Sequence, residues 1–250
     1  QNRIEPFLDI NDPRRLCSPN SPFRKYLARK MADLKEKFLV LASLRGPYVY
    51  CVSLCGMKRL LTLIVKNPSF VKYMIDKVSE FTSEASKSLI DLGVDGLFLR
   101  EDMAYKNGPF FSPQVYESII MSGHRRVFMT YRGRGLPVVL HCDGDFRPLI
   151  PALIRAGVSA IQPLEVNAGM DVRELKPKYG DEIAFIGNVD KNMLSGTLEQ
   201  VRREVVSKLE AACPGGGYVI GSDHSVPSTV PLQNYEYMIK LAKKHGRYKP

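Results

Sequence analysis

The chain has 250 residues, of which 44% are hydrophobic and 25% charged, and this suits one globular domain over residues 1–250. The longest apolar runs, such as LPVVL and FLVLA, are far shorter than the ~20 residues of a membrane span, and no signal segment opens the chain, so we expect a soluble, cytoplasmic protein with no membrane partner. The net charge of +10 is spread along the expected helices without an aromatic-interleaved basic stretch, so nucleic acid is not the expected partner; an acidic ligand or a merely basic surface fits the charge as well.

Residues 1–30, which include NDPRR and SPNSP, have the composition of a loop and surface-helix segment and contain no convincing first strand. After them, short apolar runs alternate with amphipathic segments, and the apolar runs lack the strict alternation of half-exposed strands. The expected strands are Phe38 to Ser43, Val94 to Arg100, Leu136 to Cys142, Val158 to Leu164, Ile183 to Val189 and Tyr218 to Asp223. The expected helices are Asn67 to Leu92, Pro113 to Arg132, Phe146 to Ala156, Val172 to Lys178, Thr197 to Ala212 and Leu232 to Lys244.

One plan recurs along the chain. SLIDLGVDGLFLRED and ALIRAGVSAIQPLEV each indicate a helix closed by a left-handed glycine and followed at once by a buried strand. Ser112-Pro113 and Gly196-Thr197 are typical of helix starts. Six such alternating units predict a parallel sheet, either doubly wound or closed as a barrel.

Polar residues gather where these strands end, and this favours a TIM-type (βα)8 barrel, whose chemistry lies at the carboxyl ends of its strands. A doubly wound sheet usually carries a glycine-rich phosphate loop, and neither GxGxxG nor GxxxxGK[ST] occurs in this sequence. The Pro214-Gly215-Gly216-Gly217 run precedes a strand and therefore indicates a turn. Six units fall short of eight, so we expect a barrel that is incomplete at its N-terminus.

The stretch VVLHCDGD raises the main chemical question, because a buried strand ends in imidazole, thiol and carboxylates. On an extended strand His141 and Asp143 face the same side, while Cys142 faces the other way and is expected to pack. Gly144 permits a sharp turn. Asp145 is expected to be the N-cap of the helix that starts near Phe146.

The ends of the other strands supply the remaining candidates. Asp102, rather than its neighbour Glu101, is expected to point into the barrel mouth, where it joins Glu165 and His224. A set of His141, Asp143 and His224 could bind zinc with an open position for a substrate, or could orient a substrate without metal; the spacing does not separate these alternatives. Tyr105 and Tyr218 are expected to be packing residues. His124 and His245 are expected at the surface.

Cysteine usage bears on the compartment. The five cysteines form no CxxC pair, and their odd number argues against a secreted disulfide framework, so a reducing compartment is expected; they are Cys17, Cys51, Cys55, Cys142 and Cys213.

Three long runs carry a family resemblance: HCDGDFRPLIPALIRAGVSAIQPLE, AGMDVRELKPKYGDEIAFIGNVD and GTLEQVRREVVSKLEAACPGGGYVIGSDHSVPSTVPLQNY. With the upstream run from NPSFVKYMIDKV to QVYESII, they resemble the uroporphyrinogen decarboxylase superfamily, which includes corrinoid-linked methyltransferases. The resemblance covers nearly everything after about Phe38. It implies a (βα)8 barrel with its site at the C-terminal mouth. The family's first strand and its RQAGR-type motif, which grips substrate carboxylates in true decarboxylases, are not present in this sequence.

The resemblance also bears on metal ligation. Zinc methyltransferases of the superfamily carry His-x-Cys at one strand end and a distant Cys near the last strand. Here the first pattern is His141-x-Asp143, and His224 falls where the distant Cys would be. Because soft thiolate ligands are absent, the resemblance does not favour thiol activation by zinc. The HxDGD form resembles a decarboxylase-like subgroup that we place nearer to methyltransferases.

Three hypotheses follow. In the first, a small methylated substrate delivers its methyl group to a corrinoid protein, while catalytic residues activate the leaving group, with or without zinc. In the second, an acidic tetrapyrrole such as uroporphyrinogen is decarboxylated without a cofactor, with Asp102 or His224 as proton donor and cations supplied by Arg100, Arg147 and Arg45. In the third, the barrel is a non-catalytic binding subunit whose exposed strand edges require a partner or a homodimer. The predicted catalytic residues are His141, Asp143, His224 and Asp102, and the predicted substrate-binding residues are Arg100, Glu165, Arg147 and Asn188.

Overall fold

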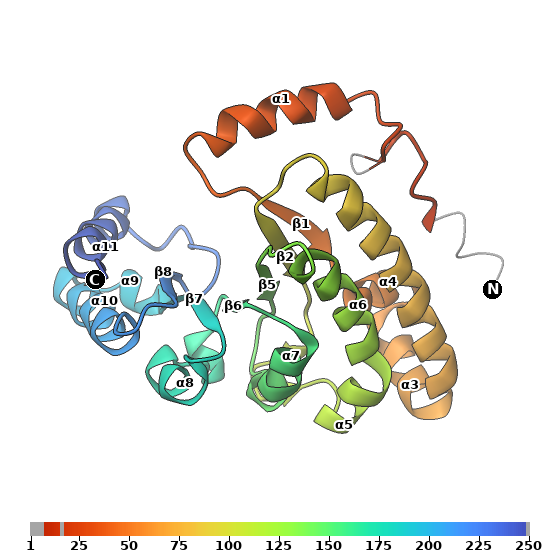
Figure 1. Cartoon of the computed structure of the whole chain (residues 1–250). Helices are drawn as coiled ribbons and strands as arrows, with labels where there is room; N and C mark the ends of the chain where they lie inside the picture. The colour runs from red at the N-terminus through yellow and green to blue at the C-terminus, as the bar shows by residue number, and fades with distance from the viewer. Residues whose placement is uncertain (1–7, 16–17, 249–250) are drawn as a thin grey trace. The chain divides into compact units, whose positions relative to one another are not determined.

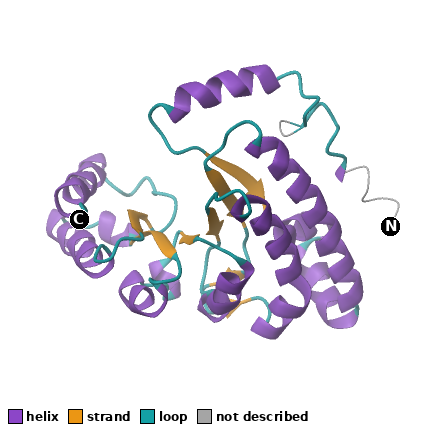
Figure 2. Ribbon diagram, in the orientation of Figure 1, coloured by secondary structure: helices purple, strands orange, loops and turns teal. Residues whose placement is uncertain are grey.

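The computed structural model describes residues 8–15 and 18–248. Contacts between residues divide the chain into two compact units, and each unit is built from three separate segments. The first unit contains the chain up to Glu101, together with Phe110–Leu140 and Pro151–Val158. The second contains Asp102–Pro109, His141–Ile150 and the chain from Ser159 onward. Figure 1 follows the elements along the chain, and Figure 2 shows that helices and strands alternate through most of it.

The first unit is built on parallel strands in the order β1, β2, β5. These strands are β1 (Leu41–Arg45), β2 (Gly96–Arg100) and β5 (Val138–His141), whose last residue belongs to the second unit. Its helical elements are α1 (Arg24–Lys35), α2 (Pro47–Cys55), α3 (Met57–Lys66), α4 (Pro68–Ile90), α5 (Pro113–Val115), the π-helix η2 (Tyr116–Ile120), α6 (Met121–Arg132) and α7 (Ile150–Ala156), whose first residue belongs to the second unit. The long helix α4 packs against α6, and the two run side by side in Figure 1.

The second unit has its own parallel strands in the order β6, β7, β8, and a short antiparallel pair. The strands are β6 (Ala160–Gln162), β7 (Ala184–Val189) and β8 (Tyr218–Ser222), with β3 (Ala104–Tyr105) paired to β4 (Gly108–Pro109). Its helices are the 3-10 turns η3 (Arg147–Leu149) and η4 (Val166–Ala168), then α8 (Val172–Tyr179), α9 (Lys191–Leu194), α10 (Leu198–Ala212) and α11 (Leu232–His245). The central helix α10 contacts α8, α9, α11 and β7.

All six predicted strands and all six predicted helices are confirmed, with ends that move by up to three residues. The predicted residues at helix starts and ends are confirmed as well. Gly93 and Gly157 have left-handed φ values of 89° and 107° after their helices. The Ser112 side chain accepts a hydrogen bond from the Val115 N–H, and Thr197 forms a capping box with Gln200.

Helices α2, α3 and α9 and the short strands β3 and β4 were not predicted from the sequence. The α2 segment, PYVYCVSLC, is apolar around most of its circumference and so lacks the one-sided pattern that marks a surface helix. The turn at Gly56, whose φ is 80°, joins α2 to α3. The short helix α9 has only four residues. The predicted surface helix within residues 1–30 is α1 in part, since α1 buries no residue but runs on to Lys35, while residues 1–7 and 16–17 lie outside the described part of the chain.

No single helix within residues 8–15 and 18–248 is both long and apolar enough to cross a membrane; only α2 and α3 taken together reach the required length and composition, and they are bent by 106°. Four cysteines are free thiols in the described residues, and Cys17 lies outside them; the four are Cys51, Cys55, Cys142 and Cys213. The expectation of one domain over residues 1–250 stays a prediction.

Candidate functional site

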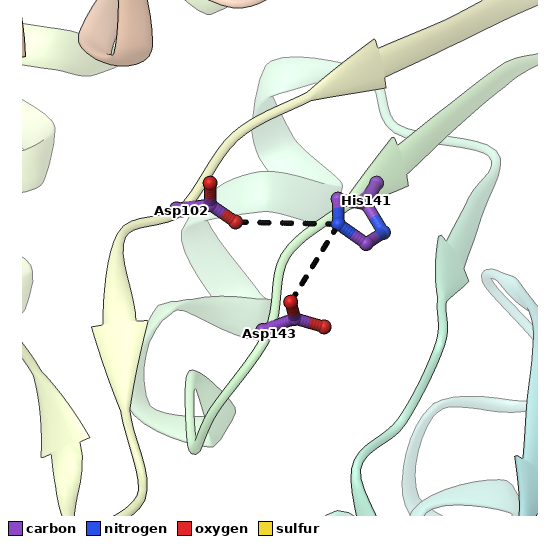
Figure 3. Close-up of side chains that lie close together, drawn as sticks. All are labelled: Asp102, His141 and Asp143. Atoms are coloured by element: carbon purple, nitrogen blue, oxygen red, sulfur yellow. Dashed lines mark ion pairs between the residues drawn. The ribbon is translucent and has the colours of Figure 1, made fainter. Parts of the chain in front are cut away.

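Three side chains of the second unit converge where β5 ends (Figure 3). Nε2 of His141 lies 4.0 Å from Oδ1 of Asp102 and 3.9 Å from Oδ2 of Asp143. One ligand atom from each of the three residues lies within 4.8 Å of the others. The predicted shared face of His141 and Asp143 is therefore confirmed, and Asp102 joins them from the segment before β3.

A second imidazole approaches from the loop after β8. Nε2 of His224 lies 3.5 Å from Oδ2 of Asp143, so one carboxylate oxygen faces both histidines. A cavity of about 420 Å³ opens here, and its lining residues are His141, Asp143, Gln162, Pro163, His224 and Ser225. The structure thus brings together all four predicted catalytic residues. We call Asp102, His141, Asp143 and His224 the strand-end cluster.

The other nitrogen of His141 has a defined partner. Nδ1 lies 2.6 Å from Oε1 of Gln162, the last residue of β6. The backbone N–H of Cys142 donates to the Gln162 carbonyl at 3.0 Å and fixes the two strand ends side by side. Cys142 itself is fully buried, and its sulfur accepts the Met103 N–H at 3.3 Å, which confirms the prediction that it faces away and packs.

The two oxygens of the Asp143 carboxylate have different surroundings. Oδ1 of Asp143 is buried and has no hydrogen-bond partner among the described residues, while Oδ2 faces two imidazole nitrogens. An ionised carboxylate only accepts hydrogen bonds, so Oδ2 can take an N–H from an imidazole, and a cation near the buried Oδ1 would compensate for its missing partner. Imidazole nitrogen and carboxylate oxygen are ligands that zinc accepts, and the donor set of this cluster therefore fits a zinc ion.

A closed series of contacts links the loops that follow β5, β6, β7 and β8, and we call it the loop ring. Oε2 of Glu165 accepts the Gly144 N–H at 3.2 Å, and Oε1 lies 3.6 Å from Nζ of Lys191. The Lys191 N–H donates to Oδ1 of Asp223 at 3.0 Å. Asp223 precedes His224 in the chain, and the contact of His224 with Asp143 closes the ring.

Asp223 is the buried anchor of the loop ring. Its side chain is fully buried, and its second oxygen accepts the Val166 N–H at 3.1 Å. Burial raises the pKa of Asp223 above its ordinary value, against the lowering effect of its two backbone hydrogen bonds. Sequence reasoning missed Asp223, Gln162 and Lys191. In the sequence Asp223 directly precedes the candidate His224. The alternation of side chains along a strand does not show which backbone groups the Asp223 carboxylate binds.

A sequence profile described as uroporphyrinogen decarboxylase (URO-D) matches residues 4–245. The chain belongs to the URO-D family. That membership confirms the predicted resemblance and the predicted α/β fold of TIM-barrel type.

The relatives of this URO-D chain include uroporphyrinogen decarboxylases from Pseudoalteromonas translucida, 26% identical over 67% of this chain and 46% of the relative, and from Trichodesmium erythraeum, 21% identical over 89% and 63%. The chain therefore spans about half to two thirds of the length of these curated relatives. Among solved structures, a methyltransferase from Methanosarcina mazei has a similar fold, with a TM-score of 0.72 and 17% identity over 88% of this chain and 64% of that one.

Arg147, a predicted substrate-binding residue of the URO-D chain, has an internal partner. The Arg147 guanidinium donates to both oxygens of Asp145 at 2.8 Å, and this contact lowers the pKa of Asp145. Asp145 also accepts the Arg147 N–H, but the N-cap residue of η3 is Phe146, so the predicted cap is displaced by one residue. Asp145 closes a local turn in which its side chain bonds a backbone two residues on.

Asn188 is a framework residue rather than the predicted substrate contact. It is fully buried with φ of 72°, and its amide nitrogen donates to the carbonyls of Leu164 and Met170. Its oxygen accepts the Val172 N–H at 2.8 Å and Nζ of buried Lys208 at 2.7 Å. The prediction for Asn188 is corrected because these bonds fill its hydrogen-bonding capacity and leave nothing for a ligand.

Arg100 ends β2 in the first unit, where it is exposed. The expectation that His124 is at the surface is wrong, because its ring is fully buried, stacks on Phe128 and lies 2.7 Å from Oε1 of Glu101. The basic residues next to His124 in the sequence suggested a surface position, but on α6 its side chain faces the interior. His245 is exposed and Tyr218 buried, as expected, while Tyr105 is 49% exposed.

Proposed function

We propose that this chain carries the substrate site of a methyltransferase, which takes a methyl group from a small methylated oxygen or nitrogen compound and passes it to a corrinoid on a partner protein. The observation that carries the proposal is the lining of the cavity at the strand-end cluster. In the described part of the chain this lining offers imidazole, carboxylate, amide and hydroxyl groups and contains neither lysine nor arginine. Such a lining suits a small neutral or cationic substrate.

The size of the cavity supports the same substrate class. About 420 Å³ lies near the lower end of the range of small-molecule sites, roughly 300–1,000 Å³. A cyclic tetrapyrrole with many carboxylates needs more room and several cations around it. The similar fold of the Methanosarcina mazei methyltransferase adds support at the level of architecture.

The residues of the cluster can activate the leaving group. When the bond between the methyl carbon and the substrate oxygen or nitrogen breaks, the electron pair stays on that heteroatom, which then takes up a proton. His141 and His224 both face the cavity and can hold that proton as imidazolium. Asp143 stabilises the imidazolium of either, because Oδ2 lies within 3.9 Å of both Nε2 atoms. The corrinoid, when bound, supplies the nucleophile for the methyl carbon.

A zinc ion fits the same residues. His141, Asp143 and His224 would hold it, and the Asp102 carboxylate is close enough to His141 to join them. Zinc would polarise the departing heteroatom as a Lewis acid. The buried, unpartnered Oδ1 of Asp143 supports such a role, because a cation near this carboxylate would compensate for its missing hydrogen bond.

Incubation of the full-length protein with reduced corrinoid protein and a panel of methoxylated and methylaminated compounds tests the proposal. The cobalt absorption spectrum should show methylation with at least one compound. His141→Ala and Asp143→Asn should lower the rate by at least about a hundredfold. His245→Ala, which changes an exposed histidine, is the matched control and should leave the rate unchanged.

Decarboxylation is the competing function, because the curated relatives are uroporphyrinogen decarboxylases. Parallel incubation with uroporphyrinogen, followed by counting of the product's carboxylates, tests it directly. Carboxylate loss that depends on His141 would overturn the methyl-transfer proposal. Absence of turnover in both assays, with folded protein, would also overturn it and would favour a binding subunit.

A further inference from the structure

The two ring nitrogens of His141 face different groups. Nδ1 contacts Oε1 of Gln162 at 2.6 Å, while Nε2 faces the carboxylates of Asp102 and Asp143 at 4.0 and 3.9 Å. The two nitrogens therefore have different environments: a tight hydrogen bond on one and looser, negatively charged neighbours on the other. Which nitrogen carries the proton in the neutral ring decides what Nε2 can do.

We propose that Gln162 is the positioning residue that holds His141 in its Nδ1–H tautomer and so presents the Nε2 lone pair to the strand-end cluster. An amide oxygen only accepts hydrogen bonds, so the contact at 2.6 Å requires a proton on Nδ1. Neutral imidazole in water prefers the opposite tautomer, with the proton on Nε2. The geometry at Gln162 reverses that preference.

The backbone keeps Gln162 in place. Its carbonyl accepts the Cys142 N–H at 3.0 Å, so the residue after His141 is hydrogen bonded to the residue that holds the His141 ring. The side chain of Gln162 is half-buried and also lines the cavity. A shift of β6 against the end of β5 would break both bonds together.

The inference deepens the proposed function and rests on it for its consequence. With a lone pair on Nε2, His141 can take up a proton or bind a cation. The facing carboxylates stabilise the positive charge in either case. With a proton on Nε2, the neutral ring would only donate to Asp102 or Asp143 and could bind no metal through that atom. Metal-binding histidines commonly donate their second ring N–H to such an outer partner.

The test is a long-range ¹H–¹⁵N correlation spectrum of the full-length, ¹⁵N-histidine-labelled protein at about pH 8.5, where an unperturbed imidazole is neutral. We expect His141 to show a protonated Nδ1 and an unprotonated Nε2. Gln162→Leu should move the proton to Nε2, while Gln162→Glu, which keeps an acceptor, should leave it on Nδ1. Gln233→Leu, at an exposed glutamine of α11, is the matched control.

A zinc titration of the same variants adds a second readout. Gln162→Leu should weaken zinc binding about ten- to a hundredfold, and Gln162→Glu should retain it. A wild-type spectrum with the proton on Nε2, or a tautomer unchanged by Gln162→Leu, would overturn the inference. If Gln162→Leu does not fold, the wild-type and Gln162→Glu spectra decide the question. The spectrum needs neither zinc nor corrinoid. The tautomer of His141 can therefore be determined even if the protein shows no methyl transfer.

Discussion

Glu101 and His124 form a completely buried contact in the first unit, with Oε1 of the carboxylate 2.7 Å from Nε2 of the imidazole. The carboxylate also accepts the N–H groups of Tyr48 and Val49 at the start of α2. Nδ1 of His124 lies 2.9 Å from the Tyr116 hydroxyl. Burial raises the pKa of Tyr116 well above its ordinary value, so the phenol keeps its proton and is able to donate to Nδ1. Glu101 thus ties β2, α2 and α6 together through one side chain.

Replacing this carboxylate by an amide should destabilise the protein. In the wild type the Glu101 carboxylate accepts from backbone N–H groups and faces the imidazole. Glu101→Gln replaces one of its oxygens by an NH₂ group, which cannot accept, and we expect a loss of about 3 kcal/mol in the free energy of unfolding. Urea unfolding followed by circular dichroism measures the change. Glu84→Gln, in an exposed ion pair with Lys87, is the control and should change the value by less than about 0.5 kcal/mol. Equal effects of the two substitutions would contradict the assigned role.

Gly46 is small because Glu101 occupies the space beside it. A Cβ atom at Gly46 would overlap Cδ of Glu101, although the φ of −78° at this residue is acceptable for any side chain. We expect Gly46→Ala to cost about 1–3 kcal/mol by overpacking. In a Glu101→Ala background the same substitution should cost less than about 0.5 kcal/mol, because the obstructing side chain is gone. A cost that is the same in both backgrounds would refute the steric explanation.

Asp171 predicts a specific pH dependence of stability. Burial raises its pKa, but hydrogen bonds from Arg173 and Lys208 outweigh burial and bring the pKa to about 2, below the ordinary 3.8. The carboxylate therefore contributes stability that is fully present above pH 3.8 and is lost as the pH falls through about 2. Asp171→Asn should lower the free energy of unfolding by about 2 kcal/mol at pH 7. It also leaves buried Lys208 without this partner.

Urea unfolding at several pH values between about 7 and 2.5 measures this effect. The difference between wild type and Asp171→Asn should shrink toward the acid end, where the carboxyl is protonated in the unfolded chain and begins to take up its proton in the folded protein. Asp181→Asn, at an exposed position in the same unit, serves as the control and should give a small difference at every pH. A difference that is constant with pH would show that the charge of Asp171 is not responsible.

Zinc should stabilise the folded protein through the strand-end cluster. At free zinc about a hundred times the Kd, we expect a gain of about 3 kcal/mol, seen as a rise in Tm that a chelator reverses. His141→Ala should abolish the rise, whereas His245→Ala should retain it. A zinc-dependent rise that survives in His141→Ala would place the ion elsewhere.

Local sequence patterns are enough to predict local geometry in this chain. Two-residue periodicity was enough to place His141 and Asp143 on one face and Cys142 on the other, because a short strand fixes that geometry by itself. Gln162 and Asp223 were not predicted, because their roles depend on partners in other strands and loops and neither has an unusual local sequence. Glu101 and His124 were missed for a related reason: charge and basic neighbours indicate a surface, and only tertiary contacts show that two such groups satisfy each other in the interior.

The loop ring has a consequence for how the site responds to substitution. Its links run from Gly144 through Glu165, Lys191 and Asp223 to His224, and back to Asp143. Because the series of contacts is closed, any two of its residues are connected in both directions around the ring. Loss of one contact therefore leaves the loops connected through the remaining contacts, and loss of a second contact separates them. Paired substitutions in this circuit should therefore cost more than the sum of their separate effects.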